Sequence, residues 1–140
     1  PSRLDFIGQA SLSGCSALQS VEIPEGVTDI IDLAFENCVS LTSISFPEAM
    51  TSIRSLVMKG CKGLETIYLP SGITSVGGSA FAGCTAVMSV TCAAVTPPDV
   101  ASNSFADMAG QATLYVPAGS EGAYAESGWG EHFTNIAAME

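Results

Sequence analysis

Basic residues are scarce in this chain, which carries four Lys and Arg against 14 Asp and Glu and has a formal net charge of −10. Proteins bind phosphate backbones through stripes of Lys and Arg that displace counterions. The basic residues here are too few and too scattered for such a stripe: Arg3, Arg54, Lys59 and Lys62. We therefore exclude nucleic acids and anionic membranes as direct partners, and we interpret the acidic residues as a solvated surface.

Long apolar runs are also missing. No stretch of roughly 18 uncharged apolar residues occurs, so we predict no segment that inserts into a membrane. The chain begins at Pro1 without an initiator methionine or a basic leader followed by an apolar run. Because the repeat described below starts at full strength, without a polar cap, we expect the natural array to extend further toward its N-terminus.

Catalytic and metal-binding signatures are absent as well. There is no Gly-x-Ser-x-Gly, phosphate loop, dinucleotide fingerprint or Cys-x-x-Cys pair, and the single histidine, His132, has no catalytic partner at a recognisable spacing. Asp29, Asp32 and Glu36 lack the glycine and the terminal glutamate of a calcium loop, and we interpret them as a solvated acidic edge. We expect no enzymatic activity, no cofactor and no metal.

The sequence does contain an internal repeat. The segment EGVTDIIDLAFENCVSLTSISFP, residues 25–47, recurs before and after itself with its apolar positions in register. We divide residues 1–117 into five units, the last with one extra residue ahead of Phe105: 1–24, 25–47, 48–70, 71–93 and 94–117. A period of this size is typical of a solenoid, whose coils bury their apolar sides only by stacking on each other.

Each unit contains one clear strand pattern. Ile44 and Phe46 alternate with Ser43 and Ser45, which predicts a half-buried strand, and Pro47 ends it. Because the register is the same in every unit, we predict five parallel strands in one sheet, about 4.8 Å apart. A second extended piece and a short helical turn follow, and the turns place one bulky row in the opposite wall: Phe35, Met58, Phe81 and Phe105.

The outward positions of these strands are the candidate binding residues. They form two rows in which hydroxyl side chains dominate, with Tyr68 and Tyr115 as the aromatic members. We predict that a protein partner binds to Glu22, Ser43, Ser45, Thr66, Tyr68, Ser89, Thr91, Thr113 and Tyr115.

Four of the five cysteines recur at the same position of successive units, as Cys15, Cys38, Cys61 and Cys84. Met108 occupies the same column in the fifth unit, and a thioether there indicates packing. We therefore expect buried, reduced thiols that act as small apolar residues. We expect the same of the remaining cysteine, which replaces a strand aliphatic at position 92.

Residues 118–140 do not follow the repeat, and we predict that they form a C-terminal cap. Ser120 to Gly128 is typical of a short helix, with Ser120 as its N-cap and Gly128 as its stop. We expect Tyr124, Trp129 and Phe133 to cover the open end of the last coil. The alternative for Trp129 is a binding anchor, and we favour packing.

The pattern Ile-x-x-x-Ala-Phe-x-x-Cys-x-x-Leu-x-x-Ile-x-Phe-Pro, from Ile30 to Pro47, resembles the BspA-like class of bacterial leucine-rich repeats, and the resemblance covers about four-fifths of the chain. It implies a right-handed α/β solenoid: a leucine-rich-repeat coil stack with a short parallel sheet, short helical turns on the opposite wall and a C-terminal cap. It also implies a secreted or surface-exposed protein of host-associated bacteria, used in adhesion or protein binding.

Three functions follow from these observations. The strand rows form a face that binds a protein, such as a host surface or matrix protein, or the chain is a structural spacer that presents another domain. Glycan binding on the two tyrosines is the third function, and we rank it last because the tyrosines lie two coils apart.

Overall fold

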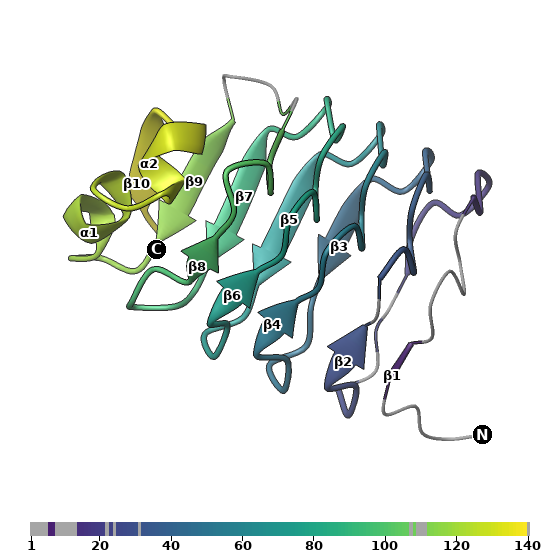
Figure 1. The fold of residues 1–140 in the computed structure, drawn as a ribbon, viewed down its shortest axis with the longest axis horizontal. Helices are drawn as coiled ribbons and strands as arrows, with labels where there is room; N and C mark the ends of the chain where they lie inside the picture. The colour runs from purple at the N-terminus through teal and green to yellow at the C-terminus, as the bar shows by residue number, and fades with distance from the viewer. Residues whose placement is uncertain are drawn as a thin grey trace.

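The protein is described by a computed structural model that covers residues 6–7, 14–21, 23, 25–30, 32–106, 108 and 112–139. The chain winds into a solenoid of parallel strands, with its coils side by side along the long axis and two short helices at the C-terminal end (Figure 1). The predicted fold class, a solenoid of stacked coils with a C-terminal cap, is confirmed.

The main sheet contains five parallel strands in the spatial order β10-β9-β7-β5-β3. Their bounds are Ser43–Ser45 for β3, Thr66–Leu69 for β5, Ser89–Cys92 for β7, Thr113–Val116 for β9 and Asn135–Ala138 for β10. Equivalent residues of successive units pair directly, and one buried row runs through Ile44, Ile67, Val90 and Leu114. The inward register predicted from the repeat is therefore confirmed.

The origin of the fifth strand differs from our prediction. We expected one strand from each unit, but residues 14–21 and 23 of the first unit form no strand, and β10 comes from the cap. A segment at the end of a stack has a pairing partner on one side only, so its strand is the weakest. A backbone hydrogen bond of 3.4 Å from the Thr42 N–H to the Gln19 carbonyl links this segment to the next coil.

A second wall is built from the short extended pieces that follow each turn. β1 (Phe6–Ile7) pairs with β2 (Asp29–Ile30), and β4 (Ser52–Ile53), β6 (Ser75–Val76) and β8 (Asp99–Val100) form a three-stranded parallel sheet. The extra residue of the fifth unit lies ahead of β8, because Val76 pairs with Val100, 24 positions later. The insertion therefore changes a loop and leaves the register intact.

The third wall consists of turns, where we expected short helical turns. Within the described part of the chain, the only helices are the two in the cap. Backbone hydrogen bonds in this wall run between coils: the Phe35 N–H donates to the Val57 carbonyl at 2.9 Å, and the Met58 N–H donates to the Ala80 carbonyl at 2.7 Å. Other donors are satisfied within the turn, as when the Cys38 N–H donates to the Phe35 carbonyl at 3.3 Å. Because the donors are shared between the next coil and single turns, no continuous helix forms.

The core lies between these walls. Phe35, Met58, Phe81 and Phe105 are at most 3% exposed, as predicted, and the rings of Phe81 and Phe105 stack with centroids 5.5 Å apart. The thiols of Cys38, Cys61, Cys84 and Cys92 are buried and are not in disulfides. This row of aromatic and sulfur side chains fills the centre of the second to fifth units.

The buried thiols also carry hydrogen bonds between coils. Cys61 Sγ donates to the Phe35 carbonyl at 3.1 Å, and Cys84 Sγ donates to the Met58 carbonyl at 3.3 Å. Burial raises the pKa of the Cys38 thiol to about 11, and burial likewise raises the pKa of Cys92. The expected burial is confirmed for these four cysteines, whereas Cys15 is partly exposed. The thiols of Cys61 and Cys84 add polar contacts that we did not predict.

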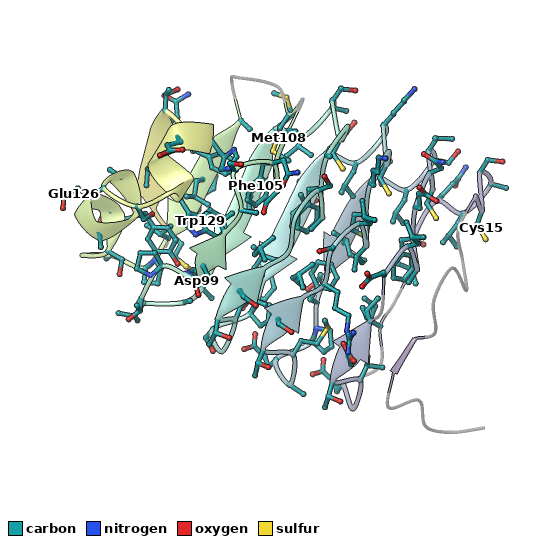
Figure 2. The ribbon with its side chains drawn as sticks, viewed as in Figure 1. Cys15, Asp99, Phe105, Met108, Glu126 and Trp129 are labelled. Carbon is teal, nitrogen blue, oxygen red and sulfur yellow. The ribbon has the colours of Figure 1, made fainter. Side chains whose placement is uncertain are left out.

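The cap closes the C-terminal end of the core. It contains α1 (Glu121–Ala125) and α2 (Trp129–His132), and Tyr124, Trp129 and Phe133 are buried. Trp129 Nε1 donates to the Pro98 carbonyl at 2.9 Å, and its ring lies 5.2 Å from that of Phe105 (Figure 2). Trp129 is therefore a packing residue, and the binding-anchor alternative is wrong.

Two details of the cap differ from the sequence prediction. Ser120 occupies the N-cap position of α1, but its hydroxyl donates to the Val95 carbonyl at 2.9 Å and does not cap the helix. Gly128 does not end α1, which stops at Ala125; it is the N-cap of α2. The loop that carries the extra residue presents carbonyl groups to the cap. The Ser120 hydroxyl donates to one of them and does not accept a hydrogen bond from the N–H groups at the start of α1.

We predict that Phe105→Ala destabilises the protein by about 3–5 kcal/mol, because the lost ring leaves a cavity between the last coil and the cap. Denaturant unfolding measures this loss. As a control, Tyr115→Ala removes a ring from the same coil at a 36% exposed position and should cost less than about 1 kcal/mol. Equal losses in the two variants would contradict the role of Phe105 in holding the cap.

We further predict that Cys38→Ala and Cys61→Ala each cost about 1–2 kcal/mol through lost packing. Thiol labelling of the native protein should modify only Cys15, which is partly exposed, and leave the four buried thiols unreacted until denaturant is added. Fast labelling of several cysteines in the native state would show that the row of thiols is open to solvent.

Candidate functional site

The predicted binding residues lie together on the outward side of the main sheet. The strand register places them in two straight rows: Ser43, Thr66, Ser89 and Thr113 in one, and Ser45, Tyr68, Thr91 and Tyr115 in the other. Asn135 and Ala137 of β10 extend the rows by one position each. We call these ten side chains the outer face. Glu22, the remaining predicted residue, lies outside the described residues.

The outer face carries no charged side chain. Its residues are Ser, Thr, Tyr, Asn and Ala, although the chain as a whole has a formal net charge of −10. The residues between them on β3, β5, β7 and β9, such as Ile44 and Val90, are buried, so the outward side chains of these four strands stand on a continuous core. The result is a neutral surface on a strongly acidic protein.

Tyr68 is oriented by Glu48, which lies at the other end of the same repeat unit, 48–70. Its hydroxyl donates to Glu48 Oε2 at 2.8 Å, and Glu48 Oε1 accepts hydrogen bonds from the Ser71 N–H at 3.3 Å and the Ser71 hydroxyl at 3.2 Å. Burial, together with the Glu48 carboxylate, raises the pKa of Tyr68 to about 12. The same hydrogen bond from Tyr68 lowers the pKa of Glu48.

We did not predict the pair of Glu48 and Tyr68 from the sequence. The repeat could have indicated it. Glu48 and Ser71 are the first residues of successive units and so occupy the same column in neighbouring coils. Tyr68 lies near the end of its strand, just ahead of Ser71 and within reach of that column.

Tyr115 lies on the same face as Tyr68, two strands away. The register joins Tyr68 to Thr91 and Thr91 to Tyr115, so two inter-strand spacings, about 10 Å, separate the tyrosine backbones. Tyr115 is 36% exposed, whereas Tyr68 is half-buried. The geometry of the two tyrosines agrees with the sequence prediction.

An open hollow of about 510 Å³ borders Tyr68 at the β3 end of the sheet. Ile23 and Phe46 are buried beneath it, and Glu25 and Glu48 contribute carboxylates to its lining. Tyr68 and Ser45 belong to both the hollow and the outer face, so the two surfaces are continuous.

The acidic edge lies on another wall. Arg54 makes two contacts with Asp29, from Nε to Oδ1 at 2.8 Å and from Nη2 to Oδ2 at 2.6 Å. The Arg54 guanidinium lowers the pKa of Asp29. Among the described residues, no group of three or more His, Cys, Asp or Glu side chains is placed to hold a metal ion.

We predict that Tyr68→Phe raises the pKa of Glu48 toward its ordinary value, because the main cause of its lowering is removed. An NMR titration of the Glu48 carboxyl measures the change, with Tyr115→Phe as the control that leaves Glu48 unaffected. A carboxyl whose pKa is lowered by folding stabilises the fold above its unfolded pKa and loses that contribution as the pH falls. The difference in melting temperature between Tyr68→Phe and the wild type should therefore be present at neutral pH and vanish in acid.

Comparisons with known proteins agree on the repeat. The family model described as "BspA type Leucine rich repeat region (6 copies)" matches residues 1–110. A leucine-rich repeat protein from Bacteroides ovatus is 32% identical, with a TM-score of 0.60 over 62% of this chain and 23% of that chain. The pneumococcal vaccine antigen PcpA is 18% identical, with a TM-score of 0.73 over 100% of this chain and 40% of that chain, and this likeness shows the fold alone. No curated protein matches.

The chain therefore spans less than half the length of each of these two structures. In the described part of the chain, neither helix is long and apolar enough to cross a membrane. The match to the family model covers most of the sequence and includes the motif from Ile30 to Pro47. The chain belongs to the BspA-type leucine-rich repeat family.

Proposed function

We propose that this chain is a non-enzymatic, protein-binding adhesion module of a secreted or surface-exposed bacterial protein. It binds a protein partner, such as a host surface or matrix protein, through the outer face. The observation that carries this proposal is the neutral, hydroxyl- and tyrosine-bearing outer face on a chain with a net charge of −10.

The composition of the outer face supports a role in recognition. Charged residues are depleted at the centres of protein interfaces, and tyrosine is enriched there. Tyrosine provides a large rigid contact area, and small hydroxyl side chains adapt to different partners. The hydrogen bond from Tyr68 to Glu48 fixes the tyrosine before any partner arrives. Less side-chain entropy is then lost on binding.

The relatives support the cellular location. PcpA, which shares the fold, is a pneumococcal vaccine antigen, and exposure to a host is compatible with the location that we propose. Members of repeat families present extended surfaces built from equivalent positions of successive coils, as the outer face does here. We extend both properties to this chain as part of the proposal.

The alternative is a spacer that presents another domain. This function is favoured by the continuous core and by the backbone hydrogen bonds that join successive coils on all three walls, because both make the array stiff. In that case the hydroxyl rows serve only to keep the surface hydrated.

The double variant Tyr68→Ser, Tyr115→Ser distinguishes these functions. We predict that it weakens binding to immobilised extracellular-matrix proteins by about tenfold or more and leaves the fold intact by circular dichroism. Surface plasmon resonance on a panel of such proteins measures the affinity.

The matched control is Met88→Ser, Val95→Ser, which removes two exposed apolar side chains from outside the outer face. It should leave the affinity unchanged. Equal affinity of the tyrosine variant and the wild type, or no binding by the wild type to any member of the panel, would favour the spacer.

A further inference from the structure

The last strand of the main sheet has an open edge. Among the described residues, β10 pairs only with β9. The Met139 N–H donates to the Val116 carbonyl at 2.7 Å, so the backbone groups of Met139 point toward β9. In a parallel strand, the N–H and C=O of one residue point to one side and those of the next residue to the other. The backbone groups of Ile136 and Ala138 therefore point away from β9.

β10 lacks two of the features that normally protect such an edge. Proteins block edge strands with prolines, charged side chains or a covering segment. The sequence of β10 is Asn-Ile-Ala-Ala, which contains neither a proline nor a charge. By contrast, β3, β5 and β9 are each followed closely by a proline, at Pro47, Pro70 and Pro117.

The inward side of β10 is incompletely covered. Ile136 pairs with Leu114 and Ala138 with Val116, and both β9 residues are fully buried. In contrast, Ile136 is only half-buried and Ala138 is exposed. A hollow of about 500 Å³ lies here between the strand and the two helices, lined by apolar groups of Ala125, Phe133 and Ile136. The three elements lie together at the C-terminal end of the molecule (Figure 1).

The surroundings of the hollow are acidic. No Lys or Arg follows Lys62 in the sequence. Glu121 lines the hollow, Glu131 is exposed next to Gly130 of its lining, and Glu126 projects from the same end (Figure 2). The carboxylates of Glu121 and Glu131 on these helices would attract an incoming segment with Lys or Arg side chains.

We propose that the open edge of β10 binds an extended, basic segment of a partner protein as an additional strand. The backbone groups of Ile136 and Ala138 hydrogen bond to the segment, one of its apolar side chains enters the hollow, and its Lys or Arg side chains lie against Glu121 and Glu131. Strand addition of this kind draws affinity from the main chain and specificity from alternate side chains. It uses the free edge and the inward side of β10, whose outward side chains belong to the outer face, and does not depend on the function proposed above.

The test uses a fluorescein-labelled peptide of alternating Val and Lys, with a Val and Glu peptide as the charge control. Fluorescence polarisation should show binding of the Lys peptide only, with an affinity that falls as salt is added. Ala138→Pro should weaken this binding by about tenfold or more, because it removes an outward N–H while the pairing with β9 remains. Tyr115→Ser, on the outer face, should have no effect.

A second arm leaves the protein unchanged. A Lys peptide that is N-methylated at alternate residues keeps its charge but cannot pair with the edge, and it should bind about tenfold or more weakly. Equal binding of the methylated peptide, or of the Glu peptide, would overturn the proposal. Self-association of the wild-type chain in sedimentation, abolished by Ala138→Pro, would also overturn it, since the edge would then be covered by a second copy.

Discussion

The structure depends on the stacking of each coil on the next in one register. The apolar side chains of a single coil have too few neighbours within that coil to be buried, so burial comes from the coils on either side. Phe81, for example, packs against Phe105 of the following coil, and its backbone N–H donates to the Ser104 carbonyl at 2.9 Å. Side-chain packing and backbone pairing thus require the same alignment, and a change of register would break both.

Stacking of this kind buries the apolar side chains in the middle of the array, but a coil at the end of the stack has a neighbour on one side only. The C-terminal end is covered by residues that do not follow the repeat. β10 supplies a strand for the edge of β9, and Trp129 and Phe133 cover Phe105. The loop with the extra residue is part of this closure, because the carbonyls of Ala94, Val95 and Pro98 accept hydrogen bonds from the cap. The insertion in the fifth unit is therefore a docking element for the cap.

The register that builds the core also builds the outer face. Positions that alternate with buried residues point outward in every coil. The strand register alone therefore aligns Tyr68, Thr91 and Tyr115, and no contact between their side chains is needed. The carboxylates of the described residues lie elsewhere, on the turns, on the second wall and on the cap. The separation of charge from the outer face suits the recognition function that we propose for it.

The sequence by itself determined what repeats: the solenoid, the buried row through Phe35 and Phe105, the packing role of the cysteines and the outward direction of the two tyrosines. These features follow from the constant period of the repeat, because one burial pattern is imposed on every coil. Only the tertiary structure decided what does not repeat. The fifth strand arises in the cap, Ser120 bonds to a carbonyl of an earlier loop, and Glu48 orients Tyr68 from the other end of the same unit. Such contacts join residues that share no column of the repeat, and their partners are selected by distance in space, which periodicity along the chain does not encode.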